Sequence, residues 1–349
     1  MSCNHLSREG ATEQPFKIPF TRKRTIMSNN KLKITSAVFA TAALLRVSVV
    51  HAQGIPHELE DLKARVASLE ATVSALEAQV ATIQSNHSLL LGPFVNVDPN
   101  PEAGVIGPNI VFSGANIHIV SGTGATNDNG NPTGLGNLII GYDEDPTVLA
   151  ALPLSPGDRG GSHNLVIGRA NRFTLAAFGG LVAGEVNTIS NSEASVTGGR
   201  GNTASGSFAS VSGGLLNSAS GFEASVSGGA RNFASGGQTS VTGGLSNTAT
   251  ASQASVSGGL GNTASGFQAS VSGGSSNTAS GDEASSVSGG RLNIAGGLAD
   301  SSVSGGLQNT ATGLEASVIG GTGNTAGGQG TVVLGGQGTT DNNSNSIAP

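Results

Sequence analysis

The residue run best suited to chemistry is Asp143-Glu144-Asp145, whose carboxylates could hold one Ca²⁺ ion. The alternative is that these acids form an ordinary solvated loop. Calcium-binding solenoids repeat G-G-x-G-x-D in every turn, and the glycine pairs of this chain lack that aspartate. The histidines after residue 52 do not show the spacing of a metal site; they are His57, His87, His118 and His163. We therefore expect no metal and no other cofactor.

Catalytic motifs are equally weak. Serine is abundant, but no serine lies in a G-x-S-x-G nucleophile elbow with a base and an acid placed in order. The G-x-G-x-x-G look-alikes, such as those around Gly321, belong to a glycine-rich repeat without a βαβ unit around them. We therefore expect that the protein is not an enzyme.

The composition excludes an ordinary globular core. The chain has 349 residues, with 55 Gly, no Trp, one Tyr and only 11% charged residues. Large apolar side chains are too scarce for a β-sandwich or an α/β core. Disordered chains usually combine low hydrophobicity with high net charge, whereas the mean hydropathy here is +0.02 and the sequence is strictly periodic. A repeat architecture fits both properties.

Residues 1–52 resemble an export leader. The short apolar run from Ile34 to Leu45 follows two lysines, and Val50-His51-Ala52 forms a small-x-small cleavage signature. A membrane-spanning helix needs roughly 20 residues, so this run predicts a signal peptide instead. Met27 is the start that would give a leader of ordinary length. We therefore expect an exported protein that begins near Gln53.

Cleavage after Ala52 would change the charge of the chain. The mature protein would keep 8 of 16 basic and 20 of 22 acidic residues, a net charge of −12, with Lys63 as its last lysine. Such an acidic chain lacks the positively charged surface that would attract nucleic acid or anionic lipid. The one cysteine, Cys3, would leave with the leader, so we expect no disulfide. Later segments are too short for membrane insertion.

Residues 53–91 carry the spacing of a parallel coiled coil. Their apolar residues alternate at steps of three and four over more than four heptads. The charges at g and e positions, such as Glu58 and Lys63, are attractive between in-register chains. Val at a with Leu at d favours a dimer. A single amphipathic helix packed on its own domain is the alternative. The predicted seam is Leu59, Leu62, Val66, Leu69, Val73, Leu76, Val80 and Ile83.

From Ser195 the pattern S-V-[ST]-G-G-x-x-N-x-A-x-x-x-x-A occurs nine times, with a period of 15 residues and two of 16. Shorter relatives that lack one glycine of the pair begin at Asn164 and Leu181, and another begins at Asn137. The repeated valines are Val196, Val211, Val226, Val241, Val256, Val271, Val287, Val303 and Val318. The repeated asparagines are Asn202, Asn217, Asn232, Asn247, Asn262, Asn277, Asn293, Asn309 and Asn324. The alanines that follow are Ala204, Ala219, Ala234, Ala249, Ala264, Ala279, Ala295, Ala311 and Ala326.

A period this short predicts one turn of a parallel β-solenoid with coils of 14–16 residues. Within a coil, S-V-S/T is a short strand with Val inward and hydroxyls outward, and T-A-S is a second strand with Ala inward. G-G-x-x-N is the turn between them. Stacked asparagines could form a hydrogen-bonded ladder, or each could serve its own turn. Because one Val and one or two Ala bury little apolar surface, we expect the roll to bury a further face in an oligomer.

The repeat S-V-x-G-x-x-[NS]-x-A-x-G resembles the head of YadA-type trimeric autotransporter adhesins, over about Asn137 to Gly336. The resemblance implies a left-handed parallel β-roll that forms homotrimers on the surface of a Gram-negative-type bacterium and attaches to matrix or host. The chain departs from that family in three ways. It has an extra glycine in each later coil, its coiled coil precedes the head, and residues 337–349 are expected to be a polar disordered tail rather than a β-barrel anchor.

The remaining segments are a connector and an insertion. Residues 92–136 form a β-rich connector in which Pro108 to Val120 predicts two strands, one with Ile110 and Phe112 and one with Ile117 and Ile119. Asn127-Asp128-Asn129-Gly130 predicts a turn. Residues 142–162 separate two similar segments, so they form a loop inserted into the roll. Such a loop could carry binding specificity or be a tolerated surface insertion.

These observations favour an exported, adhesin-like structural or binding protein. The expected partner is the chain itself, as a trimer or a dimer, with an extracellular-matrix or cell-surface ligand as a further candidate. A passive component of a surface layer, matrix or appendage is the first alternative. The second is ice binding by rows of hydroxyls, which Phe233 and Ile294 interrupt; the rows are Thr203/Ser205, Thr248/Thr250, Thr263/Ser265 and Thr310/Thr312.

Overall fold

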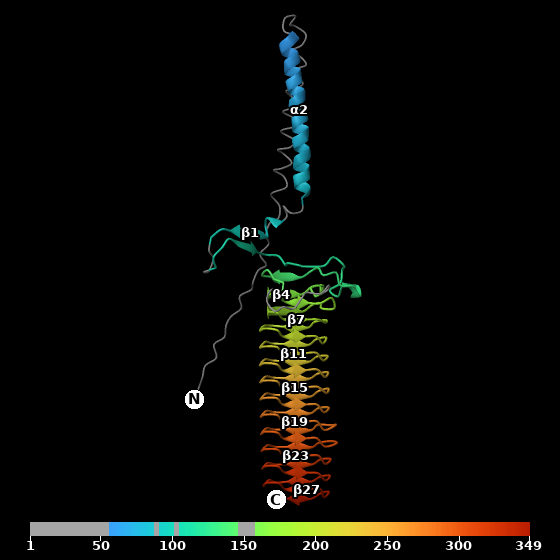
Figure 1. The fold of residues 1–349 in the computed structure, drawn as a ribbon. Helices are drawn as coiled ribbons and strands as arrows, with labels where there is room; N and C mark the ends of the chain where they lie inside the picture. The colour runs from blue at the N-terminus through green and yellow to red at the C-terminus, as the bar shows by residue number, and fades with distance from the viewer. Residues whose placement is uncertain (1–55, 87–90, 101–104, 146–157) are drawn as a thin grey trace, which may run out of the picture. The chain divides into compact units, whose positions relative to one another are not determined.

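The structure, a computed structural model, describes residues 56–86, 91–100, 105–145 and 158–349 (Figure 1). They belong to two compact units, which divide after Ala115. The predicted leader, residues 1–52, lies outside the described residues, as do the ends of the predicted coiled-coil segment at 53–55 and 87–90.

The first unit contains the helix α2 (Pro56–Ser85), 30 residues long. It confirms the helix predicted from the heptad spacing. The seam residues are largely exposed in the single chain, for example Leu69 at 64% and Ile83 at 57%. Lys63 Nζ lies 2.7 Å from Glu60 Oε1 of the same helix. The apolar stripe therefore lies on the surface of the single helix, and its burial in a coiled coil remains a prediction.

The connector forms one antiparallel pair, β1 (Val95–Asp98) with β2 (Asn109–Phe112). Strand β2 lies where the first of the two strands was predicted, but its partner precedes it in the chain. The second predicted strand is wrong, because Ile117 and Ile119 are not in a strand. Among the described residues their backbone pairs with no strand, and alternation without pairing does not make a strand.

The second unit contains the predicted parallel β-solenoid of coils of about 15 residues (Figure 1). Its 14-stranded sheet carries the repeated valines and orders its strands along the chain. These strands are β3 (Leu138–Ile140), β4 (Leu165–Arg169), β6 (Leu181–Glu185), β8 (Ser195–Val196), β10 (Ser210–Val211), β12 (Ser225–Val226), β14 (Ser240–Val241), β16 (Ser255–Val256), β18 (Ser270–Val271), β20 (Ser286–Val287), β22 (Ser302–Val303), β24 (Ser317–Val318), β26 (Val332–Val333) and β28 (Ile347–Ala348).

The 12-stranded sheet carries the repeated alanines and faces the first sheet across the core. Its strands are β5 (Arg172–Phe173), β7 (Thr188–Ile189), β9 (Thr203–Ala204), β11 (Ser218–Ala219), β13 (Phe233–Ala234), β15 (Thr248–Ala249), β17 (Thr263–Ala264), β19 (Thr278–Ala279), β21 (Ile294–Ala295), β23 (Thr310–Ala311), β25 (Thr325–Ala326) and β27 (Thr340–Asp341). Most strands of both sheets are two residues long, one shorter than the three-residue strands expected.

The core consists of columns of identical residues. In-register parallel pairing places each Val on the Val of the next coil, as Val211 on Val226, and each Ala on the next Ala, as Ala219 on Ala234. All nine repeated valines are at most 1% exposed, and the nine repeated alanines are fully buried. A third buried column precedes each valine strand and consists of Ala, Ser or Thr, for example Ala209 and Thr239. Small residues in two of the three columns make the roll thin.

Two of the three glycine positions in a coil are constrained by the close stacking of coils, although Ala251 takes the return-turn position in one coil. Gly229 has φ +82°, and a Cβ there would lie 2.2 Å from the Gly244 carbonyl oxygen. In the return turn, a Cβ at Gly221 would lie 1.9 Å from the Gly236 carbonyl oxygen. A Cβ at Gly228, the first glycine of its pair, would meet nothing within 4 Å. The glycine that the short coils retain is the constrained one, since Gly184 has φ +103° and stacks on Gly199.

The insertion lies between two adjacent coils, as the flanking similarity predicted. Strand β3 pairs in register with β4, Ile139 on Val166, although 142–162 separates them in sequence. Of the insertion, residues 146–157 lie outside the described residues.

Residues 337–349 differ from the expected disordered tail, because they form a further coil. Thr340 and Asp341 pair with Thr325 and Ala326, and Ile347 pairs with Val332. The segment lacks the repeat's apolar residues, so composition suggested a tail. The backbone of the preceding coil nevertheless offers unpaired N–H and C=O groups on which these residues stack.

Candidate binding surface

An asparagine ladder runs along one edge of the roll and fixes the shape of its surface. In each coil the Asn side chain makes three hydrogen bonds. Asn217 Nδ2 donates to the Gly213 carbonyl at 2.9 Å and to the Gly229 carbonyl of the next coil at 3.0 Å. Asn217 Oδ1 accepts the Asn232 N–H of the next coil at 2.9 Å. All nine repeated asparagines are at most 1% exposed, so each amide serves both its own turn and its neighbour.

The ladder begins at Asp143, one of the three acids considered as a calcium site. Asp143 is 5% exposed, and its Oδ1 accepts the Asn171 N–H at 2.7 Å, as an asparagine of a preceding coil would. Its Oδ2 lies 3.3 Å from Arg159. Burial raises the pKa of Asp143 above its ordinary value, against the Asn171 hydrogen bond and the Arg159 charge. Among the described residues no three His, Cys, Asp or Glu side chains gather as metal ligands.

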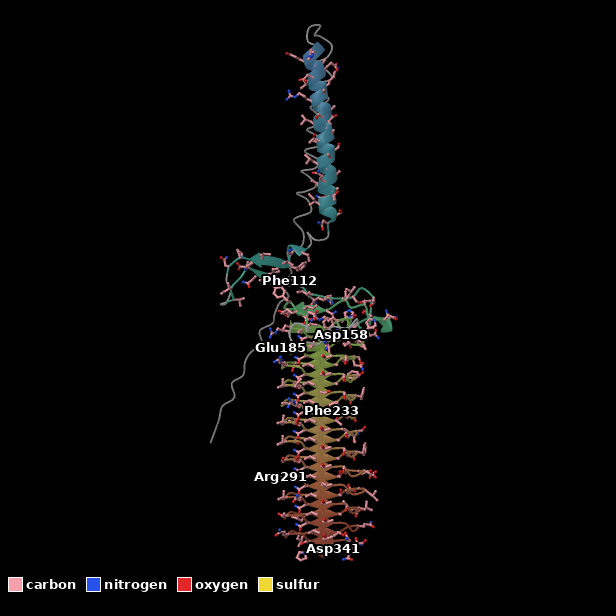
Figure 2. The ribbon with its side chains drawn as sticks, in the orientation of Figure 1. Phe112, Asp158, Glu185, Phe233, Arg291 and Asp341 are labelled. Carbon is pink, nitrogen blue, oxygen red and sulfur yellow. The ribbon has the colours of Figure 1, made fainter. Side chains whose placement is uncertain are left out.

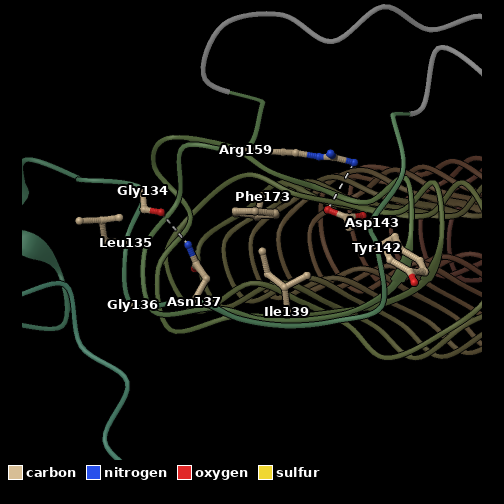
Figure 3. Close-up of a pocket in the computed structure, with 9 residues that line it drawn as sticks. All are labelled: Gly134, Leu135, Gly136, Asn137, Ile139, Tyr142, Asp143, Arg159 and Phe173. Carbon is tan, nitrogen blue, oxygen red and sulfur yellow. Dashed lines mark hydrogen bonds and ion pairs between the residues drawn. The ribbon is translucent and has the colours of Figure 1, made fainter. Parts of the chain in front are cut away.

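A pocket of about 380 Å³ lies at the same end of the roll (Figure 3). Ile139 belongs to the inward valine column but is 48% exposed, and Phe173 beside it is 3% exposed. Figure 3 shows the Arg159–Asp143 ion pair at one side of the pocket and the Asn137–Gly134 hydrogen bond at the other. This pocket is the end of the core column, and its lining residues are Gly134, Leu135, Gly136, Asn137, Ile139, Tyr142, Asp143, Arg159 and Phe173.

A second polar cluster is built on Asp128, in the predicted turn, which forms the 3₁₀ helix η3 (Asp128–Gly130). Asp128 is 2% exposed and accepts hydrogen bonds from the hydroxyls of Ser121, Thr123 and Thr133. Hydrogen bonding, first from Ser121 and then from Ser162, the Thr133 backbone and Thr123, holds the pKa of Asp128 well below its usual range.

Ser121, His163 and Asp128 bring together the residue types of a catalytic triad, but not its geometry. The Ser121 hydroxyl donates directly to Asp128, and His163 Nε2 accepts the Ser121 backbone N–H at 3.0 Å. The imidazole is therefore not placed to take the hydroxyl proton. The cluster fixes the segment before β3 to the first coils, since Ser162 Oγ also accepts the Gly134 N–H at 3.1 Å.

The two sheets give the roll two broad faces. On the valine face, the residue after each core valine is an exposed Ser or Thr in eight consecutive coils: Thr197, Ser212, Ser227, Thr242, Ser257, Ser272, Ser288 and Ser304. On the alanine face, the residue before each core alanine is mostly Thr and only partly exposed. Phe233 and Ile294 interrupt that row and are 39% and 41% exposed. The more continuous hydroxyl row therefore lies on the valine face, not on the rows singled out by sequence.

The turns give the roll two narrow edges. The arginine edge is formed by the two residues before each ladder asparagine, where bridges link Arg200, Leu215, Ala230 and their successors coil by coil. It carries half-exposed leucines and the arginines Arg200, Arg231 and Arg291. Figure 2 shows Arg291 and Glu185 on this same edge.

The acidic edge is formed by the return turns from the alanine strands to the valine strands. Its residues stack through backbone hydrogen bonds such as Glu223 N–H to Ser207 O and Asp300 N–H to Glu283 O. Phe208 and Phe222 meet edge to face with ring centroids 5.7 Å apart. A side-chain ladder from Glu223 through Gln238, Gln253 and Gln268 continues along it. Sequence reasoning missed both edges because it treated turn residues as variable.

In the described part of the chain, no helix has the length and apolar character to cross a bilayer. No protein-family model matches this chain, and no curated protein matches it.

Proposed function

We propose that the protein is an exported, non-enzymatic, adhesin-like structural protein whose oligomeric roll presents an extended surface for attachment to matrix, host or other surfaces. The observation that carries the proposal is the valine face. It repeats one exposed hydroxyl in eight consecutive coils on a backbone fixed by two ladders of hydrogen bonds. A rigid array of identical weak sites gains affinity through multivalency rather than through one pocket.

The exposed stripe on α2 supports the oligomeric part of the proposal. Six seam residues of the single helix are 42–64% exposed: Leu62, Leu69, Val73, Leu76, Val80 and Ile83. Burying them in a parallel coiled coil would align the copies of the chain. The resemblance of the repeat to YadA-type heads favours three copies, and the Val/Leu seam favours two.

Ice binding is the second candidate, and the spacing of the valine-face hydroxyls favours it. Parallel in-register pairing sets neighbouring hydroxyls about 4.8 Å apart along the row. A regular lattice of hydroxyls can match a crystal surface without a discrete receptor.

The test uses the mature chain, residues 53–349, on immobilised matrix proteins and in an ice-shaping assay. Saturable retention on a matrix protein is the expected result. Changing Ser227, Ser257 and Ser288 of the valine face together to Glu should lower that retention. Ile294→Thr on the alanine face is the matched control and should leave it unchanged. Ice shaping without retention on any matrix protein would support the second candidate. Absence of both activities would favour a passive surface-layer component.

A further inference from the structure

The charges of the roll are separated between its two edges. Between residues 186 and 349 all three arginines lie on the arginine edge, as Arg200, Arg231 and Arg291. The acids of this region, apart from the buried Asp341, lie on the acidic edge: Glu193, Glu223, Asp282, Glu283, Asp300 and Glu315. One side of the roll therefore carries positive charge and the opposite side negative charge.

These opposite charges occur at matching heights. Each arginine follows an acid of the opposite edge by seven or eight residues: Arg200 follows Glu193, Arg231 follows Glu223, and Arg291 follows Glu283. A separation of half a coil corresponds to a difference in height of about 2.4 Å along the roll. The two edges of one chain cannot meet, because the core columns lie between them.

We propose that the arginine edge of one copy docks on the acidic edge of a second copy of this chain, with the two rolls parallel and unstaggered. This inference rests on the proposed oligomer and adds one side-by-side contact between two of its rolls. In this register Arg231 faces the partner's Glu223, Arg291 faces the partner's Glu283, and Arg200 faces the partner's Glu193.

The intrachain ion pairs leave two of these arginines available. Among the ion pairs of the described residues, Arg231 and Arg291 do not occur. Both side chains are exposed. Arg200 differs, because its Nε lies 3.5 Å from Glu185 of the same edge, although its side chain is still 59% exposed. Arg231 and Arg291 therefore provide the sharpest test.

The register is specific. Displacing one roll by a single coil would place Arg200 opposite Phe208 and Arg231 opposite Gln238 of the partner, and would leave only Arg291 facing an acid, Asp300. One apolar pair fits the unstaggered arrangement as well. Leu216 faces the partner's Phe208, and these side chains are each 48% exposed in the single chain. Both broad faces stay open in this arrangement, so attachment and self-association use different surfaces.

Cysteine cross-linking in residues 53–349 tests the contact, since the one cysteine of the sequence, Cys3, lies outside this range. Gln238→Cys on the acidic edge and Ser246→Cys on the arginine edge are eight residues apart and should meet between copies. Mild oxidation should link copies of this double variant through disulfides. The control pair, Ser246→Cys with Gln329→Cys, is offset by about six coils, or roughly 29 Å, and should give little or no cross-link.

Charge reversal then tests the cause of the contact. Adding Arg231→Glu and Arg291→Glu to the first pair should lower the initial cross-linking rate roughly tenfold. Adding Glu223→Arg and Glu283→Arg as well should restore the rate, because the charges are then exchanged between the edges. Ser227→Glu with Ser288→Glu, on the valine face of the same coils, is the control and should leave the rate unchanged.

Three outcomes would overturn the proposal once circular dichroism has shown that the variants are folded. These are equal cross-linking of the two cysteine pairs, cross-linking of neither pair, and a rate that charge reversal does not change. Retention on immobilised matrix proteins is measured on the same samples. Loss of cross-linking with retained attachment would reject the edge contact alone, whereas cross-linking without attachment would reject the proposed function alone.

Discussion

At the scale of single residues, the roll depends on groups that serve two coils at once. Asn217 holds its own turn and the next one through three hydrogen bonds, and Gly229 lets successive turns approach. Many turn positions also hold a non-glycine residue at positive φ, for example Leu216 at 57° and Arg231 at 54°. The stacked backbone keeps these residues in a conformation that they rarely adopt alone.

The two glycines of one pair should respond differently to the same substitution. Gly229→Ala places a Cβ at φ +82° and 2.2 Å from the Gly244 carbonyl oxygen, so we expect a loss of about 1–3 kcal/mol in the free energy of unfolding. Gly228→Ala meets nothing within 4 Å and should be neutral or slightly stabilising. Urea denaturation followed by circular dichroism measures both. Equal effects of the two substitutions would contradict the assignment of the constrained glycine.

At the scale of elements, the regular coils differ from the segments at the two ends of the array. Asp143 takes the place of an asparagine at the start of the ladder, and Asp341 takes the place of an alanine in the last coil described. Hydrogen bonds from Ser346 and Asn343 lower the pKa of Asp341. Polar partners therefore hold a carboxylate at two positions where the regular coils have an asparagine or an alanine.

The segment around Asp128 should be the part of the roll most sensitive to acid. Because its folded pKa lies well below that of an unfolded Asp, about 3.9, the carboxylate stabilises the segment above that pH. This contribution is lost as the pH falls through the folded pKa. Hydrogen exchange should therefore show residues 116–136 losing protection in strong acid before the coils from 196 to 336.

The control for this experiment is Asp128→Asn, which should weaken protection of residues 116–136 at all pH values, since an amide cannot replace an acceptor of four hydrogen bonds. The interpretation would be wrong if the wild-type segment and the central coils lost protection together.

At the scale of the whole molecule, the roll is quasi-one-dimensional. Each coil of the array pairs only with the coil before it and the coil after it. Its free energy of unfolding is therefore approximately the sum of a contribution from each coil and a contribution from each contact between neighbouring coils. The number of coils can change without altering the structure of the others. An oligomer held by α2 and by the edges would extend this arrangement sideways without changing the coils.

Removing three whole coils should shorten the roll and leave it folded. Deleting residues 226–270 joins Ser225 to Val271 and keeps the repeat in register. We expect a roll shorter by about 14 Å with the same β-type circular dichroism spectrum per residue. Deleting residues 226–262, which removes an incomplete number of coils, is the matched control and should disrupt stacking. Loss of all β structure in the first deletion would contradict a modular solenoid.

The 15-residue period of the sequence predicted much of this fold. A 15-residue repeat with one Val, one Asn and one Ala at constant offsets allows one solution in which each residue stacks on its own copy. The insertion at 142–162 followed from the same logic. The helix α2 followed from the heptads, whereas its partner helix is still a prediction.

Other features were settled only by tertiary structure. Residues 337–349 have the composition of a tail, yet they stack because the previous coil leaves a backbone edge for them to pair with. The Asp128 cluster brings together residues between 121 and 163, and no local sequence pattern predicts it. The separation of charge between the two edges could also be recognised only in the structure. Turn residues vary from coil to coil, and the fold alone shows on which edge of the roll each turn lies.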